Sequence, residues 1–345
     1  DNNSTTILDD FDSILENHKY ANKGIYNLLA TATNNLGDTT YEDLAITVSF
    51  KETSLAGIRE TLFKTGQNEY SFLTINLHTY QEEDQLEKLN MVIDVIGQMD
   101  IDFITFQECA QHKSAELIDA IIREDNMAHL IVAGLDEKYS TSYKFSWDWA
   151  HYGWNVWEEG VSVLSKYPIL ENEARYVSSS TSKTNIESRK VIYSACQLPD
   201  GKQINMYSVH THWRTSLTSE EQNNQIKNIQ AMVDEKSTAN SYSFVAGDFN
   251  VNPTSDYPWS EGYKTMIANG NYVDTYLLAN DGANNKPAQS QHNTVLGDFP
   301  GRIDYIFMKS NADFEVVDSQ IIFRADIVGK VSDHYGVITK VRLIN

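Results

Sequence analysis

The pattern of apolar and polar positions predicts alternating strands and helices from about residue 71 onward. Apolar runs over 72–78 and 101–106 are expected to be strands, and both end in polar residues. Between them, apolar side chains recur every three or four positions, which predicts an amphipathic helix: Leu86, Leu89, Ile93 and Ile96. A further helix is expected over 114–124. This order is typical of an α/β fold, in which polar residues at strand ends commonly form the site.

The second half of the chain continues the same pattern. Strands over 190–198 and 203–212 are predicted to pair across the turn Pro199-Asp200-Gly201. A helix should start near Ser219, which has capping-box spacing with Gln222. More strands are expected over 242–246, 301–307, 314–323 and 336–343. Because no linker or repeat interrupts this order, residues 71–345 are predicted to form one domain.

Residues 1–70 show no recognisable chemistry and are predicted to be an accessory segment of unknown role. Helical patterns are expected over 8–15 and 25–36, and a strand over 44–50. The chain starts at Asp1 without Met, in a stretch rich in Asn, Ser and Thr. Such a start fits a mature secreted protein and equally a trimmed chain, so secretion or surface display is slightly favoured over a cytoplasmic location.

Composition narrows the class of protein. A chain of 345 residues with 41% hydrophobic residues can bury a large core, and no apolar run is long enough to span a bilayer. The net charge of −21 disfavours sequence-independent binding to nucleic acid. A nuclease is still possible, because a bound divalent metal and a few local Arg or Lys invert the field within a site. The oligomeric state is open.

The run Val245 to Pro253 ends a strand in turn-forming polar residues. Gly247 permits a tight backbone, and Asp248 and Asn250 lie two positions apart, on one side of extended backbone. A carboxylate and an amide so placed suit a hydrated cation or an attacking water. An isolated Asp-x-Asn is more often an Asx turn, so this interpretation depends on companions elsewhere.

Further strand ends and neighbouring loops supply such companions: Asn76, Glu108, His212, Asp304, Asp333 and His334. Mg²⁺ prefers oxygen ligands and accepts only one or two protein carboxylates, a pattern that Glu108 and Asn76 fit. Mn²⁺ would also accept His. Hydrolysis of a phosphate ester needs a positioned water and donors around oxygens that gain charge, and imidazoles held by carboxylates serve as donors or proton carriers.

An aromatic stretch over 147–160 contains four Trp and a Tyr within eleven residues. Each buried indole N–H needs a hydrogen-bond partner, so this many Trp residues would be unusual in an ordinary core strand. A ligand-facing wall and a structural loop are about equally plausible.

Six short sequence motifs together resemble those of the endonuclease/exonuclease/phosphatase superfamily: Thr74-Ile75-Asn76, Gln107-Glu108, Thr211-His212-Trp213, Gly247-Asp248-Phe249-Asn250, Arg302-Ile303-Asp304-Tyr305 and Ser332-Asp333-His334. The resemblance covers roughly residues 71–345. It implies a four-layer α/β sandwich, in which two mixed sheets pack face to face with helices outside.

The resemblance also implies roles for individual residues. Glu108 is expected to be the main Mg²⁺ ligand, with Asn76 and Asp333 nearby. Asp248 would orient or deprotonate the attacking water, with Asn250 beside it. The remaining assignments pair His334 with Asp304 and His212 with Glu159, and place Arg189 on the substrate phosphate. His210 shares a strand face with His212, which is preferred because Thr-His before a large apolar residue is the family's usual form.

The aromatic stretch also resembles a segment of maltose phosphate phosphatases in this superfamily. It implies that His151, Trp154 and Trp157 bind a small phosphorylated sugar. A secreted phosphodiesterase acting on DNA or a phospholipid head group is the alternative. A non-catalytic binding protein on the same fold is a third possibility, and the complete set of acids, amides and imidazoles argues against it.

Overall fold

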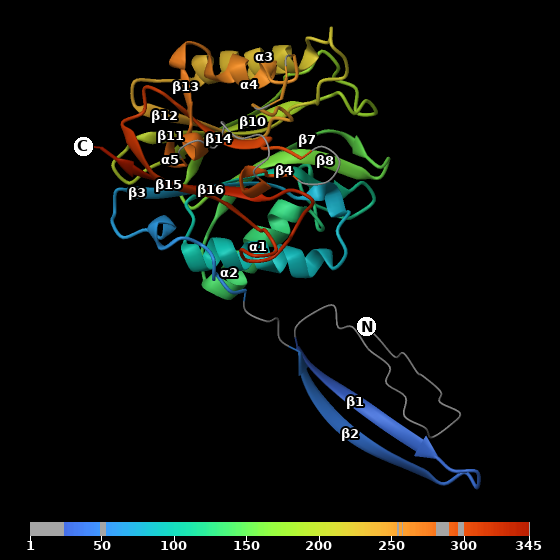
Figure 1. The fold of residues 1–345 in the computed structure, drawn as a ribbon. Coiled ribbons are helices and arrows are strands. Elements are labelled where there is room, and N and C mark those ends of the chain that lie inside the picture. The colour runs from blue at the N-terminus through green and yellow to red at the C-terminus, as the bar shows by residue number, and fades with distance from the viewer. Residues whose placement is uncertain are drawn as a thin grey trace. The chain divides into compact units, whose positions relative to one another are not determined.

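The protein is described here by a computed structural model that covers residues 24–48, 53–253, 255–256, 258–280, 290–295 and 300–344 (Figure 1). Contacts divide the chain into two compact units, residues 1–52 and 53–345. The predicted helix over 8–15 lies outside the described residues. Within them, no helix is both long and apolar enough to cross a membrane.

Two six-stranded sheets form the body of the larger unit (Figure 1). The first runs in the order β13-β14-β12-β11-β10-β9. Its strands are β9 (Ile169–Tyr176), β10 (Lys190–Gln197), β11 (Gln203–His210), β12 (Ser241–Asp248), β13 (Tyr272–Asp274) and β14 (Asp304–Lys309). Only β11 and β12 are parallel neighbours, and the other pairs are antiparallel. The sheet is therefore mixed, as expected.

The second sheet runs in the order β15-β16-β3-β4-β8-β7. Its strands are β3 (Glu69–Asn76), β4 (Phe103–His112), β7 (Lys144–Gly153), β8 (Trp157–Ser165), β15 (Phe314–Ile322) and β16 (Gly336–Leu343). Here β3 and β4 are the parallel pair. Each sheet thus contains one parallel pair of strands, and within each pair the carboxyl ends of the two strands lie side by side.

Helices cover the outer faces of the sheets and complete four layers (Figure 1). The outer helices are α1 (Gln85–Met99), α2 (Met127–Tyr139), α3 (Glu221–Lys236) and α4 (Glu261–Ile267), whereas the short α5 (Thr275–Ala279) packs at the core between the sheets through Tyr276. Short 3₁₀ segments lie at Glu60–Leu62, His78–Tyr80, Ala268–Gly270 and Ser290–His292. The apolar stripes of α1 and α2 pack on the second sheet, and those of α3 and α4 on the first. Between the sheets lies a core of inward side chains such as Phe72, Phe103 and Phe244, each fully buried. The four-layer α/β sandwich is confirmed.

Two local predictions within the larger unit were wrong. Residues 114–124 do not form a helix: they contain the short antiparallel strands β5 (Leu117–Asp119) and β6 (Ile122–Arg123). Ser219 does not cap α3, which begins after Glu220 without a side-chain cap bond. Gln222 instead turns inward and donates to the carbonyls of His212 and Asn250, both at 2.9 Å, so it supports the polar end of the first sheet.

The described part of the smaller unit is an antiparallel hairpin of β1 (Gly24–Thr33) and β2 (Thr39–Val48). The helix predicted over 25–36 is therefore a strand and a turn. The strand predicted over 44–50 overlaps the end of β2 as far as Val48, and residues 49–50 lie outside the described residues. The larger unit begins at Thr53, earlier than the predicted boundary at 71. Ile58 and Leu62 are buried in its core, which ties this segment to the sandwich.

Candidate active site

The polar residues of the site are brought together by the two parallel strand pairs. His210 at the end of β11 stands opposite Asp248 at the end of β12, and Asn76 of β3 stands opposite Gln107 of β4. A Cβ on Gly247, whose φ is 147°, would lie 2.0 Å from the carbonyl oxygen of Val209. Only glycine allows the backbones of β11 and β12 to approach this closely.

Asn76 connects the two sheets at this edge. Its side-chain nitrogen donates to Glu108 Oε1 at 2.9 Å, on the second sheet, and to Asp248 Oδ2 at 3.2 Å, on the first. Burial and the nearby carboxylate of Glu159 raise the pKa of Glu108 to about 8. Burial and the neighbouring Asp304 raise the pKa of Asp248 to about 7. The region therefore holds more negative charge than its own partners neutralise.

His334 lies between two of these acids. Its Nδ1 is 2.9 Å from Asp304 Oδ2, and its Nε2 is 3.8 Å from Asp248 Oδ2. Burial would lower the pKa of His334, but Asp304 and Asp248 outweigh it and hold the pKa well above the usual value. The predicted pairing of His334 with Asp304 is present, and it gives an imidazolium whose Nε2 side faces Asp248.

Glu159 of β8 lies among cationic and polar partners. Its Oε1 is 3.2 Å from His151 Nε2 and 3.6 Å from Arg189 Nη1, and Thr79 donates to its Oε2 at 3.0 Å. Burial would raise the pKa of Glu159, but His151 and Arg189 lower it. Glu159 is thus the more acidic member of the Glu108–Glu159 pair. Arg189 is buried, and its Nε has no partner among the described residues.

The structure favours His210 over His212 as the imidazole of the site. His210 Nε2 is 3.6 Å from Asp248 Oδ2, and a ring nitrogen of His210 lies within 4.8 Å of carboxylate oxygens of Glu108 and Glu159. Burial, with Arg189 and His151 nearby, holds the pKa of His210 well below its usual value, which favours the neutral ring. His212 lies beyond the end of β11. There its ring packs on Trp213 with centroids 3.9 Å apart, and the predicted pair with Glu159 does not form among the described residues.

A cavity of about 380 Å³ opens over these groups. Its floor is polar and its rim is partly aromatic. The lining residues are Glu108, Tyr152, Gly153, Trp154, Glu159, Ile186, Arg189, His210, Trp213, Asp248, Asn250 and His334. Asn250 donates its side-chain N–H to the Thr211 carbonyl at 2.9 Å, so its amide oxygen is the group left to meet a ligand.

The predicted aromatic wall is only partly present. Trp154 lines the cavity and is 54% exposed, at a turn where its φ is 48°. Trp157 does not line the cavity: it stacks on Tyr80 with ring centroids 4.6 Å apart. His151 is buried behind the cavity, with Nδ1 donating to the Ser188 carbonyl at 2.9 Å. His151 and Trp157 lie on the paired strands β7 and β8, whereas Trp154 lies in the turn that joins them, so the three side chains do not form one wall.

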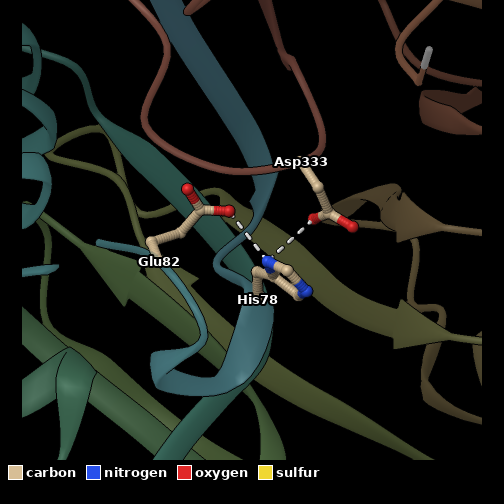
Figure 2. Close-up of side chains that lie close together, drawn as sticks. All are labelled: His78, Glu82 and Asp333. Carbon is tan, nitrogen blue, oxygen red and sulfur yellow. Dashed lines mark hydrogen bonds and ion pairs between the residues drawn. The ribbon is translucent and has the colours of Figure 1, made fainter. Parts of the chain in front are cut away.

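Asp333 lies at the side of the site rather than against Glu108. Figure 2 shows its carboxylate directed to His78, whose Nδ1 is 3.5 Å from Asp333 Oδ1 and 2.8 Å from Glu82 Oε1. Asp333 is still close enough to contribute to the raised pKa of Glu108. The structure therefore brings together all the predicted floor residues except His212, and leaves Asp333 near them in a separate contact.

Several residues at the site were not predicted. Tyr152 and Trp213 line the cavity. Tyr152 stood within the aromatic stretch over 147–160 and Trp213 within the motif Thr211-His212-Trp213, so the sequence could have indicated both. Ile186 comes from a polar loop and Thr79 from the turn after β3. Neither carries a sequence signal, because their positions depend on how distant segments pack.

The fold and this set of groups define a class of protein: four-layer α/β sandwiches that hydrolyse phosphate esters. The chain belongs to the endonuclease/exonuclease/phosphatase family, whose model matches residues 73–334. No curated protein matches the sequence.

Solved structures agree with this assignment. A family protein from Leptotrichia buccalis is 27% identical with a TM-score of 0.67, and the match covers 79% of this chain and 99% of that one. A mannosyl-6-phosphatase from Bacteroides thetaiotaomicron is 17% identical with a TM-score of 0.53, over 80% of this chain and 100% of that one. The catalytic domain of human Nocturnin, with a bound sulfate anion, is 17% identical with a TM-score of 0.58, and the match covers 80% of this chain and 95% of that one. At this identity the last two show the fold alone.

Proposed function

We propose that the protein is a divalent-metal-dependent phosphoesterase that hydrolyses a small phosphorylated molecule of the sugar phosphate class. The observation that carries this proposal is the cavity of about 380 Å³, with carboxylates, imidazoles and Arg189 at its floor and Trp154 at its rim. This volume lies within the range of small-molecule sites. A chain with net charge −21 offers no extended basic track for a nucleic acid.

Each floor residue has a role that its contacts support. Asp248 orients the attacking water and accepts its proton, and the Asn250 amide oxygen holds the same water. Arg189, with a guanidinium N–H that has no partner among the described residues, donates to the phosphate. His334, held as an imidazolium by Asp304, and the neutral His210 act on phosphoryl oxygens as donors or proton carriers.

The residues fit a hard divalent cation. Glu108 and Asp248 are buried carboxylates with raised pKa values, and Asn76 is shared between them. A cation such as Mg²⁺ or Mn²⁺, held mainly by Glu108 with Asn76 and Asp333 nearby, would relieve this excess of negative charge. When bound, the metal supplies Lewis-acid stabilisation of the phosphate oxygens.

A substrate panel tests the proposal. The full chain is assayed with sugar 6-phosphates, glycerol 3-phosphate, bis(p-nitrophenyl) phosphate and single-stranded DNA, each with Mg²⁺, Mn²⁺ or a chelator. We expect metal-dependent release of phosphate from the sugar monoesters, abolished by chelator and by Asp248→Asn. Cleavage of the diester or DNA with sugar monoesters untouched would replace this proposal by the phosphodiesterase alternative. No turnover with any ester and metal would favour a binding protein.

A further inference from the structure

Directly after β3, the backbone makes a left-handed turn, and none of its residues has a role in the proposed hydrolysis. Three consecutive residues without a glycine have positive φ: His78 at 57°, Thr79 at 39° and Tyr80 at 58°. The turn is closed by a hydrogen bond from the Gln81 N–H to the His78 carbonyl at 2.8 Å. L residues disfavour this conformation, so such a turn is found where surrounding contacts enforce it.

Those contacts are present on both sides of the turn. His78 contacts Glu82 and Asp333 (Figure 2), and its N–H donates to Asn76 Oδ1 at 3.0 Å. Tyr80 donates its hydroxyl to the Asp125 carbonyl and stacks on Trp157. Held from both ends, the middle residue Thr79 is fully buried and directed into the site.

The Thr79 hydroxyl lies between the two acidic side chains at the floor of the cavity. Its Oγ1 is 3.0 Å from Glu159 Oε2, 3.3 Å from Glu108 Oε2 and 3.3 Å from the Glu108 carbonyl. The other oxygen of each acid has its own partners: Glu108 Oε1 accepts from Asn76, while Glu159 Oε1 faces His151 and Arg189. The hydroxyl thus lies within hydrogen-bond distance of the inner oxygen of both carboxylates and, having one proton, donates to one of them at a time, with Glu159 Oε2 the nearer.

The neighbouring backbone leaves room for this arrangement. A Cβ on Gly153 would lie 2.6 Å from Glu159 Oε2 and 3.3 Å from Thr79 Cγ2. Glycine at this point of β7 therefore allows Thr79 and Glu159 to meet.

We propose that Thr79 is a positioning residue that separates Glu108 from Glu159 and assigns each acid to its own task. The proposal rests on the proposed function. With the hydroxyl in place, Glu108 presents Oε1 toward Asn76, where it would be available to a bound cation, and Glu159 presents Oε1 toward His151 and Arg189. Without it, two buried carboxylates of like charge lose the donor that spaces them, and neither orientation is defined.

Three variants of the full chain test this role. Thr79→Val keeps the shape and β-branching but removes the hydroxyl, Thr79→Ser keeps the hydroxyl, and Thr79→Ala removes it without adding bulk. Two readouts are taken on each: the affinity for Mg²⁺ by calorimetry without substrate, and kcat/KM on the best ester of the panel. Thermal melting confirms that each variant is folded.

We expect Thr79→Val to weaken Mg²⁺ binding and kcat/KM by about 10- to 100-fold, with Thr79→Ser within about threefold of wild type. If Thr79→Val does not fold, Thr79→Ala takes its place, and its Mg²⁺ affinity and kcat/KM are compared with those of Thr79→Ser. Wild-type Mg²⁺ affinity in Thr79→Val and Thr79→Ala, or equal losses in the Ser variant, would overturn the proposal. Because Mg²⁺ binding is measured without substrate, it reports on Thr79 even if no ester in the panel is hydrolysed.

Discussion

At the scale of single residues, the site combines groups whose pKa values have been moved apart by their surroundings. Burial and neighbouring acids raise the pKa values of Glu108 and Asp248. Burial would also raise the pKa of Glu159, but His151 and Arg189 lower it. Acid and base assignments in enzymes commonly follow from such divergence. Side-chain identity alone did not distinguish the three carboxylates. Their neighbours did.

The two histidines near the end of β11 should differ in importance. His210 lines the cavity beside Asp248, whereas His212 packs on Trp213. We expect His210→Ala to lower kcat/KM at least about a hundredfold, as for loss of a proton carrier. His212→Ala should lower it by less than about tenfold, and steady-state kinetics on the same ester compares them. A greater loss in His212→Ala would contradict the assignment.

Trp154 should determine how well a ring-bearing substrate binds. Its exposed side chain lines the cavity at a turn with positive φ, a conformation that a Trp adopts only under constraint. We expect Trp154→Ala to raise KM for a sugar 6-phosphate about tenfold with kcat nearly unchanged, and to leave glycerol 3-phosphate unaffected. Trp259→Ala, which removes a 40% exposed Trp that does not line this cavity, is the control. Equal changes for both substrates would argue against ring recognition.

At the scale of elements, the site depends on the close approach of parallel strands. The register of β11 with β12 sets His210 opposite Asp248, and Gly247 allows it. Most of these strands could be predicted, because their apolar runs are bounded by turn residues. The antiparallel pairing of β10 with β11 across its turn was predicted as well. The parallel pairs could not be predicted, because β3 and β4 are joined through a helix and β11 and β12 through another. The failed prediction over 114–124 has a similar cause: the segment forms a small hairpin that local periodicity does not distinguish from a helix.

Gly247→Ala should separate the two strands that carry the site. Its Cβ would lie 2.0 Å from the Val209 carbonyl oxygen, so we expect the free energy of unfolding to fall by about 3 kcal/mol, with loss of most activity. The matched control is Gly201→Ala, at φ 85° in open space, which should cost about 1 kcal/mol and leave activity unchanged. Urea unfolding measures both. Similar stability of the two variants would show that the backbone contact can relax.

At the scale of the whole larger unit, charged groups join neighbouring strands in the middle of the second sheet. Glu69 at the start of β3 contacts Lys340 at 3.3 Å and Arg342 at 2.9 Å, both on β16. Burial would raise the pKa of Glu69, but the bonds from the Thr65 N–H, Arg342 and Lys340 lower it to about 2, from the usual 4.5. A lowered pKa means that the ionised form stabilises the fold above about pH 4.5, and that this stabilisation is lost as the pH falls toward 2.

Glu69→Gln should therefore lower the free energy of unfolding by about 2 kcal/mol at pH 7, the scale of hydrogen bonds to a charged group. The difference from wild type should shrink as the pH falls from about 5 toward 2. Urea unfolding at a series of pH values checks this. Glu315→Gln, which removes an exposed partner of Arg342, should change stability by less than about 1 kcal/mol. A difference that is independent of pH would contradict the role of the Glu69 charge.

The sequence by itself determined the α/β order of strands and helices, because apolar periods are local features of the chain. Its strand-end motifs, also local, resembled a known family, and that resemblance implied the sandwich and most of the polar floor. Only the tertiary structure decided which histidine faces the cavity, which aromatic residues form its rim, and that Thr79 lies between two acids. These facts depend on side-chain direction at strand ends, on backbone conformations that L residues disfavour, and on contacts between segments far apart in the chain. No local pattern encodes them.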